Sequence, residues 1–403
     1  MGRHLRRVGL VAAAVSLGLG ACTTAPPAQT STPAPSSARA ASSGAGSAAY
    51  PTSTAPRPTA PAAPGTPTTP PSPGAVGNGR ITIAFGGDVH FERHVKALLD
   101  RPDGLAELQP LLGTADVAVV NLETAITTRG TPEPKSFTFR APPSALTTLA
   151  AAGVDVAGMA NNHAVDFGPQ GLADTLAAKD ASPIPVIGVG RTAAEAFAPA
   201  VLNVRGTSVA VIASTQVGDL TATKFPASDA KPGVAANLDN SRLLAAVRAA
   251  RAKFDVVVVF LHWGTERTTC PDPRQFATAA ALEKAGADVI VGGHHHRVLG
   301  AGWLGRAYVG YGLGNFVWWL NTNTPADAAT GVLTVEIDSA AVAARAATPR
   351  DQWAGLPSVV VADHYAPLTI SAKDGVPRAA AKASARLAEW EAARACTKLK
   401  GTP

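Results

Sequence analysis

The sequence has few cysteines, one long apolar segment and no internal repeat. Of its three cysteines, Cys22 lies near the amino end, and only Cys270 and Cys396 occur in the rest of the chain. In an oxidising compartment these two side chains either pair, which would tie the carboxyl-terminal tail to the folded part, or remain free thiols. Their separation in sequence does not decide between the two.

The chain also lacks a basic run with interleaved aromatic residues. Its formal net charge is +6, but the basic residues are not concentrated in one stretch of the folded part. We therefore expect no nucleic-acid partner. No second apolar span follows the first one, so we expect no further membrane segment.

The first 22 residues are typical of an export signal. Three arginines precede an apolar run over 8–19, which is too short to span a bilayer. The run ends in Leu-Gly-Ala-Cys at 19–22, which resembles the bacterial lipobox. We therefore expect a lipid on Cys22 and an extracytoplasmic lipoprotein anchored at the membrane surface; the alternative is a plain secretory signal and a secreted protein.

Residues 23–78 consist almost wholly of Ala, Pro, Ser, Thr and Gly. Such a composition cannot bury a core, so it predicts a disordered tether that holds a folded domain away from the membrane. The remaining chain is long enough for one large domain, which we place at 79–376. The Ala-rich segment 377–403 predicts a carboxyl-terminal helix and tail.

After the tether, apolar runs of strand length alternate with helical segments. Strands are expected at 81–85, 115–120, 154–159, 185–189, 209–213, 255–261 and 287–291, and helices at 143–152, 169–179, 239–253 and 273–285. This alternation predicts a layered α/β fold. Three later runs, 307–310, 332–337 and 358–362, follow without helices between them. We therefore predict a second sheet packed on the first, in a four-layer α/β/β/α sandwich.

Five of the predicted strands end in side chains that are able to bind metal ions. They are Asp88 and His90; Asn121 and Glu123; Asn161, Asn162 and His163; His262 and Glu266; and His294 and His296. Ligands bind at the carboxyl ends of strands in open α/β sheets, so these groups can converge. The polar residues at any single strand end could simply form a turn or cap a helix. Because such residues follow five strands, they indicate a functional site. Between His294 and His296, the side chain of His295 must point elsewhere.

The mixture of carboxylate, amide and imidazole groups predicts a metal site. Such a mixture suits Mn, Fe or Zn better than a thiolate-selected or an all-oxygen site does. With about seven candidate ligands, two ions that share a bridging carboxylate are easier to satisfy than one ion.

The motifs resemble, in order, the CapA family of poly-gamma-glutamate capsule synthesis proteins. The resemblance covers residues 81–368 and rests on Gly-Asp at 87–88, Asn-Leu-Glu at 121–123, Asn-Asn-His-Ala-Val-Asp-Phe-Gly at 161–168, His-Trp-Gly at 262–264 with Glu266, Gly-His-His-His at 293–296 and Gly-Asn-Phe at 314–316. That family is in turn similar to the calcineurin-like metallophosphoesterases, which implies the four-layer sandwich and a two-metal site.

The resemblance also implies roles for single residues. One ion would be held by Asp88, His90 and His296, the other by Asn162, His262 and His294, with Glu123 as the bridge. His163 would be the catalytic acid or base, and the surrounding contacts to substrate or ligands would come from Asn121, Asn161, Asp166, Glu266 and Asn315. The chain departs from the phosphoesterase pattern in two places, because it has Asn-Leu-Glu where that pattern has Gly-Asp and Ala164 where an acid is usual.

Two functions follow from the resemblance. One is a metal-dependent hydrolase of phosphoesters, or of amide bonds in a polymer, that works beside polymer-synthase or export components. The other is a non-catalytic accessory protein that binds an anionic cell-envelope polymer such as poly-gamma-glutamate.

Overall fold

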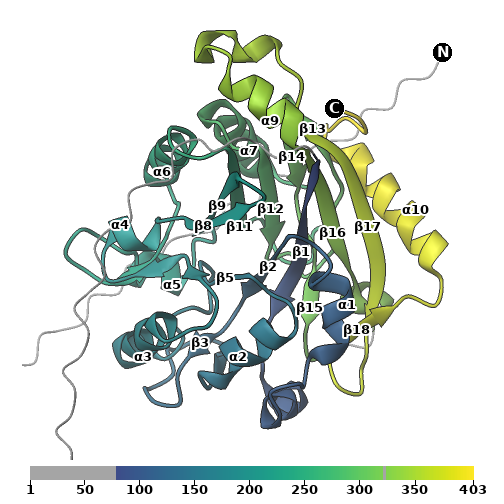
Figure 1. Ribbon diagram of the computed structural model, residues 1–403. Helices are drawn as coiled ribbons and strands as arrows, with labels where there is room; N and C mark the ends of the chain where they lie inside the picture. Colours follow the sequence, from purple (N-terminus) through teal and green to yellow (C-terminus); the bar gives the residue numbers. More distant parts are fainter. Residues whose placement is uncertain (1–78, 321–323) are drawn as a thin grey trace, which may run out of the picture. The chain divides into compact units, whose positions relative to one another are not determined.

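The computed structural model describes residues 79–320 and 324–403 (Figure 1). The expected export signal, the lipid site at Cys22 and the expected tether over 23–78 all lie outside the described residues. Among the helices that are described, none has the length and apolar character needed to cross a membrane.

The larger sheet has eight strands and is mixed. They are β1 (Arg80–Val89), β2 (Val117–Leu122), β5 (Val156–Gly158), β6 (Val186–Ile187), β15 (Asn315–Val317), β16 (Ala329–Asp338), β17 (Val360–Ile370) and β18 (Pro377–Ala379). The strand order is β18-β17-β16-β1-β2-β5-β6, and β15 also pairs with β1. Strands β1, β2, β5 and β6 are parallel, so their carboxyl ends share one edge.

The smaller sheet has six strands. They are β8 (Ala200–Val204), β9 (Thr207–Thr215), β11 (Val256–His262), β12 (Val289–Gly293), β13 (Ala301–Leu304) and β14 (Ala307–Gly310). Strands β9, β11, β12 and β14 are parallel, and β8 and β13 add antiparallel edges. Two short pairs complete the strands, β3 (Ala125–Ile126) with β4 (Arg140–Ala141) and β7 (Val189–Gly190) with β10 (Gly233–Val234).

Most helices are short. The α-helices are α1 (Gln109–Leu112), α2 (Ser144–Ala151), α3 (Gly168–Asp180), α4 (Ala193–Ala196), α5 (Leu220–Lys224), α6 (Ser241–Arg251), α7 (Pro273–Ala285), α8 (Pro325–Ala328), α9 (Ser339–Ala346) and α10 (Ala383–Ala393). The 3-10 helices are η1 (Arg93–Asp100), η2 (Ala106–Leu108), η3 (Arg350–Gly355) and η4 (Arg394–Cys396).

The two sheets pack face to face, with β1 against β12 and β5 against β9. Helix α6 covers β9 and β11 on one outer face, with α7 beside it, whereas α10 packs on β17 of the other sheet (Figure 1). The central strand β11 is buried along its whole length, as its run of valines predicts for a parallel strand covered on both faces. The predicted four-layer α/β/β/α sandwich is therefore confirmed.

Three features differ from the expected elements. Helices α8, α9 and η3 lie among the late strands, where we expected no helices; the signal of α9 is Asp338, which accepts from the Ala341 N–H at 2.9 Å. The tail begins with strand β18, and its helix starts only at Ala383. Strand β1 continues through Asp88, beyond its expected end at residue 85.

Cys270 and Cys396 form a disulfide, with their Cα atoms 5.7 Å apart. The bond joins the segment after β11 to the end of η4, 126 residues further along the chain. Of the two alternatives that the sequence left open, the structure shows pairing. Closing so long a loop restricts the unfolded chain and thereby stabilises the packed tail.

Candidate metal centre

Side chains from both sheets meet at the carboxyl ends of their parallel strands. The register of β1 and β2 sets Asp88 beside Asn121, and the register of β11 and β12 sets His262 beside Gly293, one residue before His294. Each strand therefore delivers its polar residues at the same level, although the segments are far apart in sequence. The meeting point lies where the two sheets face each other.

A first group consists of Glu123, His262 and His294, whose ligand atoms all lie within 4.8 Å of one another. The Nε2 atom of His262 is 3.5 Å from Oε1 of Glu123 and 3.2 Å from Nδ1 of His294. The amide oxygen of Asn162 lies 2.7 Å from the same Nε2 atom. Three nitrogen and oxygen donors therefore lie close enough together to hold one divalent ion, and the amide oxygen of Asn162 lies beside them.

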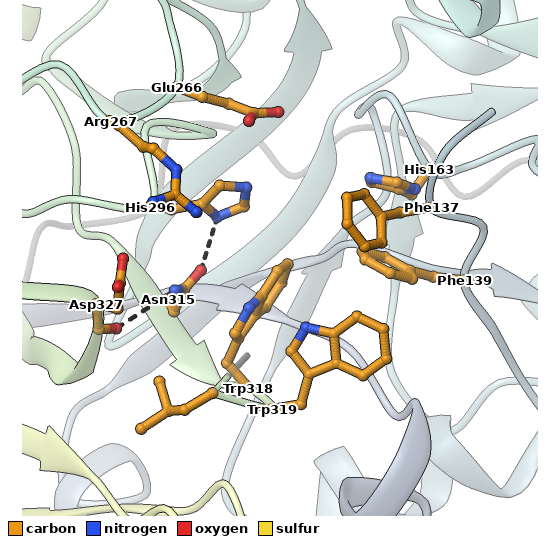
Figure 2. Close-up of a pocket in the computed structure, with 11 residues that line it drawn as sticks. Phe137, Phe139, His163, Glu266, Arg267, His296, Asn315, Trp318, Trp319 and Asp327 are labelled. Carbon is orange, nitrogen blue, oxygen red and sulfur yellow. Dashed lines mark hydrogen bonds between the residues drawn. The ribbon is translucent and has the colours of Figure 1, made fainter. Parts of the chain in front are cut away.

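A second group consists of Asp88, Glu123 and His296. Oδ2 of Asp88 lies 3.8 Å from Nδ1 of His296. Asn315 holds the His296 ring through a contact of 2.7 Å between its Oδ1 and the ring Nδ1 (Figure 2). Because Glu123 belongs to both groups, the two candidate ion positions are adjacent and share this carboxylate.

Glu123 provides the test of whether these residues fit a metal. Its side chain is fully buried, and neither carboxylate oxygen has a hydrogen-bond partner among the described residues. Burial, reinforced by the charge of Asp88, raises the pKa of Glu123 to about 8. A buried carboxylate without a partner is strongly destabilising unless a cation accompanies it, so the residues present fit divalent ions.

The histidines of the centre are suited to coordination. Burial lowers the pKa of His262 to about 4. Burial also holds the pKa of His294 well below its usual value, and the neighbouring rings of His262 and His296 act in the same direction. Both rings are therefore neutral near pH 7, the state in which an imidazole nitrogen can bind a metal.

Two asparagines, Asn121 and Asn161, form hydrogen bonds that orient residues of the centre. Asn121 donates from Nδ2 to Oδ1 of Asp88 at 2.8 Å and contacts Nδ1 of His262 at 3.1 Å. Asn161 donates to Oδ1 of Asn121 at 3.0 Å and accepts from the His163 N–H at 3.1 Å. The two amides thus link Asp88, His262 and His163 in one buried network that fixes their orientation.

Gly293 allows the Asp88 side chain to lie close to the backbone at the end of β12. A Cβ atom at this position would lie 2.2 Å from Oδ1 of Asp88, so no larger residue fits there. The following His294 N–H donates to Oδ2 of Asp88 at 3.0 Å. His294 and His296 both have positive φ, 90° and 53°, a conformation that non-glycine residues rarely adopt and that concentrates at functional sites.

His163 stands beside the two groups without belonging to either. Its Nε2 atom is 3.8 Å from Oε1 of Glu123, and its Nδ1 atom is 2.5 Å from Oδ2 of Asp166. Asp166 also accepts from the Phe139 N–H and from Nζ of Lys135, each at 2.7 Å. Asp166 is therefore held in place, and it orients the His163 ring toward the centre.

Two residues that we expected in the centre are not brought into it. His90, an expected ligand of the same ion as Asp88, belongs to neither group: its ring is stacked on Phe139 and packed edge-on against Trp318 and Trp319. The N–H of Glu92 donates to its Nδ1 at 3.0 Å. Glu266 is exposed and lies only at the rim of the adjacent cavity.

The side chain of His295, the middle one of the three consecutive histidines, points away from the centre, as its position in the run predicts. His295 is fully buried, and its Nε2 contacts the side chain of Gln275 on α7 at 3.1 Å. Burial lowers its pKa to about 3, so the ring is a neutral core residue.

A cavity of about 80 Å³ opens beside the centre, between His163 on one side and His296 with Asn315 on the other (Figure 2). One wall is aromatic and consists of Phe137, Phe139, Trp318 and Trp319. The ring of Phe139 lies between those of His90 and His163, with centroids 4.7 Å and 4.0 Å away. Our sequence interpretation missed this wall and Lys135; its only signals were the Phe-x-Phe run at 137–139 and the adjacent tryptophans at 318–319, one residue beyond the Gly-Asn-Phe motif.

The fold and the centre define a layered α/β protein with residues able to hold divalent metal ions. The model of the family described as "Bacterial capsule synthesis protein PGA_cap" matches residues 82–318, more than half of the chain, so the chain belongs to this family.

Two relatives are similar over most of the folded part. The "Capsule biosynthesis protein CapA" of Bacillus anthracis is 30% identical over 265 residues, which covers 62% of this chain and 63% of that protein. The "PGA biosynthesis protein CapA" of Bacillus subtilis (strain 168) is 28% identical over 255 residues, covering 61% of this chain and 66% of that protein. The matches thus span less than two thirds of the length of either relative.

Among solved structures, a phosphatase from Mycoplasma pneumoniae is 15% identical to the chain with a TM-score of 0.44, covering 72% of this chain and 94% of that one.

Proposed function

We propose that this protein is a metal-dependent hydrolase of phosphoesters that acts in the synthesis, export or anchoring of poly-gamma-glutamate or another cell-envelope polymer. The observation that carries the proposal is the buried carboxylate of Glu123, which has no hydrogen-bond partner in the described parts of the chain and is shared by two overlapping ligand groups. Such an arrangement suits a pair of divalent ions, Mn, Fe or Zn by the chemistry of the ligands. Membership of the capsule synthesis family supports the link to an envelope polymer.

The proposed ligands divide between two ions. Asp88 and His296 would hold one, Asn162, His262 and His294 the other, and Glu123 would bridge them. Bound divalent ions would supply Lewis acidity and an activated water nucleophile. The chain's own contribution is to fix the ligands through Asn121 and Asn161, and to keep the buried imidazoles neutral.

His163 is the proposed acid or base. Asp166 would accept a hydrogen bond from Nδ1–H of His163, so that Nε2 of the ring faces the centre. There Nε2 can hold or release a proton at the leaving oxygen of a substrate. Phe139 stacks on the ring and excludes water from its outer face. The imidazole is therefore oriented by Asp166 and shielded by an aromatic neighbour, as general acid–base chemistry requires.

We also propose that the protein works outside the cytoplasm, anchored through a lipid on Cys22. The disulfide between Cys270 and Cys396 supports an oxidising compartment. Partners would then be the polymer itself and the synthase or export components that handle it. Globomycin treatment followed by mass spectrometry of the mature amino terminus tests this; an unmodified, fully secreted chain would contradict it.

The test of the hydrolase starts with metal content. The purified full chain should contain about two divalent ions per molecule by elemental analysis, and it should hydrolyse a phosphodiester such as bis(p-nitrophenyl) phosphate. His163→Ala should lower kcat by about 10²- to 10⁴-fold and retain the metal. His364→Ala, an exposed histidine on β17, is the matched control. A chain that binds no stoichiometric metal would end the proposal.

A second candidate function is non-catalytic binding of an anionic polymer. Exposed cations at the cavity favour it: Arg267 lies at the rim, and the guanidinium of Arg93 covers the Trp319 ring at 4.1 Å. The two functions separate in one experiment, because His163→Ala strongly lowers turnover under the first and leaves polymer binding unchanged under the second. Assays of poly-gamma-glutamate cleavage cover the remaining alternative, hydrolysis of amide bonds at the same centre.

A further inference from the structure

The rim of the metal-centre cavity carries one cation that the proposed chemistry does not use. Arg267 is the one lysine or arginine among the described residues that line this cavity, and its side chain is exposed. The guanidinium forms no ion pair or hydrogen bond with the described parts of the chain, whereas Arg297 pairs with Asp327. Glu266 is the other charge beside it, and Figure 2 shows the two side chains pointing in different directions. The charge of Arg267 is therefore available to a ligand in the cavity.

The segment that carries Arg267 is held against the three consecutive histidines. The Arg267 N–H donates to the carbonyl oxygen of His295 at 2.7 Å, and the Thr268 hydroxyl donates to the carbonyl oxygen of Thr265 at 2.8 Å. The disulfide at Cys270 ties the same segment to the tail. These contacts fix the backbone at Arg267, so its guanidinium is kept at the mouth of the cavity and loses less freedom when it meets a ligand.

The backbone of Arg267 is strained, with φ at 62° in the left-handed region that favours glycine. Two other described arginines share this conformation, Arg93 with φ at 54° and Arg205 with φ at 47°. The guanidinium of Arg93 covers the Trp319 ring at 4.1 Å, and that of Arg205 donates to Asp116 at 2.5 Å. Both of these arginines therefore use the side chain that the strain places. Among the three, only Arg267 has no such partner in the described structure, and this points to a partner from outside the chain.

Arg267 lies nearer the solvent than the residues proposed to hold the ions. Glu123 and His294 are 0% and 5% exposed, whereas Arg267 is exposed at the rim. In Figure 2, Arg267 lies on the same side of the cavity as His296, and His163 lies on the opposite side. A phosphoryl group at the buried centre, with its leaving alcohol at His163, would therefore turn its other substituent toward Arg267.

We propose that Arg267 selects substrates with a second negative charge, carried on the substituent that stays on phosphorus. The inference rests on the proposed function, which sets the phosphoryl group at the centre and the leaving alcohol at His163. A guanidinium presents two parallel N–H donors that match a carboxylate or a phosphate. These two groups share the chemistry, and the experiment below distinguishes them. Arg267 thereby determines specificity and takes no part in breaking the bond.

Calorimetric titration of the full, metal-loaded chain with non-hydrolysable phosphonates tests the proposal. The charged probes are 4-phosphonobutanoate and propane-1,3-bisphosphonate, which hold a carboxylate or a second phosphonate three methylenes from the first phosphonate. The uncharged reference is 4-phosphonobutanamide. We expect at least one charged probe to bind about tenfold more tightly than the amide, and the probe that does so identifies the anionic group.

Variants assign this preference to Arg267. Arg267→Gln should abolish it, and Arg267→Lys should retain part of it, because lysine keeps the charge without the paired donors. Arg242→Gln on α6 is the matched control, since Arg242 is also an exposed arginine, and it should leave the preference unchanged. In about 1 M NaCl the preference of the wild type should shrink, because an exposed charge is screened by salt.

Two readouts separate this role from folding. Arg267→Gly relieves the positive φ, so this variant should melt at or above the wild-type temperature while it loses the preference. The metal content of all Arg267 variants should equal that of the wild type by elemental analysis. A variant that loses both the preference and the metal would show that Arg267 supports the centre and does not select the substrate.

Three results would overturn the inference: equal affinity for charged and uncharged probes, no binding of any probe, or a preference that survives Arg267→Gln. Its failure is distinct from that of the proposed function. Hydrolysis of bis(p-nitrophenyl) phosphate without an Arg267-dependent preference would refute the inference alone. A preference that depends on Arg267, in a chain that hydrolyses no phosphodiester, would refute the hydrolase and leave Arg267 as a residue that binds the anionic ligand.

Discussion

Two buried carboxylates, one at each end of strand β12, differ in their hydrogen-bond partners. At the amino end, Asp288 accepts from Arg251 at 2.6 Å, from the Val257 N–H at 2.9 Å, and from Arg345. At the carboxyl end, next to His294, Glu123 has no hydrogen-bond partner among the described residues. Both side chains are buried, yet only one of them is neutralised by the chain itself.

The pKa shifts express this difference. Burial opposes ionisation of Asp288, but the charges of Arg345 and Arg251 outweigh it and hold the pKa of this carboxyl below its usual value. At Glu123, burial and the charge of Asp88 outweigh the opposing effects of His296 and His163, so the pKa of this carboxyl is raised to about 8. The comparison teaches that a buried carboxylate paired with arginines is structural, whereas one that lies among imidazoles without an arginine partner is suited to bind an external cation.

The largest effect is expected at the amino end of β12. Asp288→Asn leaves Arg251 and Arg345 buried without a full counter-charge and should lower the free energy of unfolding by about 3–5 kcal/mol, measured by urea denaturation. The control is Asp229→Asn, since Asp229 pairs with Arg242 at an exposed position and its loss should change stability by about 1 kcal/mol or less. Equal effects of the two variants would remove the distinction drawn here.

Unlike Asp288→Asn, Glu123→Gln should not destabilise the metal-free protein. The variant should lower metal affinity by about a hundredfold or more, because it removes the ligand shared by both groups, and this is measured by calorimetry with Mn²⁺ or Zn²⁺. When a chelator keeps both proteins metal-free at pH 9, the variant should be as stable as the wild type or more stable. The reason is that the substitution removes a buried charge that lacks a partner among the described residues. Glu107→Gln, at an exposed ion pair, is the control. A destabilised metal-free variant would show that Glu123 is structural, like Asp288.

The pH dependence of stability should differ with and without metal. The folded-state pKa of Glu123 is raised from 4.5 to about 8, so the metal-free protein should lose stability as pH rises through this interval, where the unfolded chain is already ionised. Added Mn²⁺ or Zn²⁺ should remove this loss, because metal binds the ionised form. The gain in Tm on adding metal should therefore grow between pH 5 and pH 8 by a few degrees. A gain independent of pH would contradict the role of Glu123.

The smallest effect is expected at Asp166. Asp166→Asn keeps the shape of the group that orients His163 but weakens the contact to its ring, so kcat for phosphodiester hydrolysis should fall about ten- to a hundredfold with unchanged metal content. The pH profile of kcat should also shift, a change that a merely structural residue would not produce. A loss as large as that of His163→Ala would indicate that Asp166 positions more than this ring.

The strand ends could be predicted from the sequence because the signal is local. Strands β11 and β12 are continuous β-branched runs that stop at His262 and at Gly293, and a parallel sheet places such ends together. The same reasoning fails for short edge strands such as β8 and β13, whose residues are too few and too mixed to show a period. It also missed α9, whose start is marked in the sequence by the capping residue Asp338.

The sequence by itself determined which kinds of donor this protein carries, the layered fold and the family, because residue types and their order after apolar strands are written along the chain. Only the tertiary structure decided that both oxygens of Glu123 lack a partner among the described residues, that His90 is enclosed by aromatic rings, that Trp318 and Trp319 form a wall beside the centre, and that Cys270 pairs with Cys396. These features depend on contacts between segments far apart in sequence, and their distances are set by the packing of two sheets.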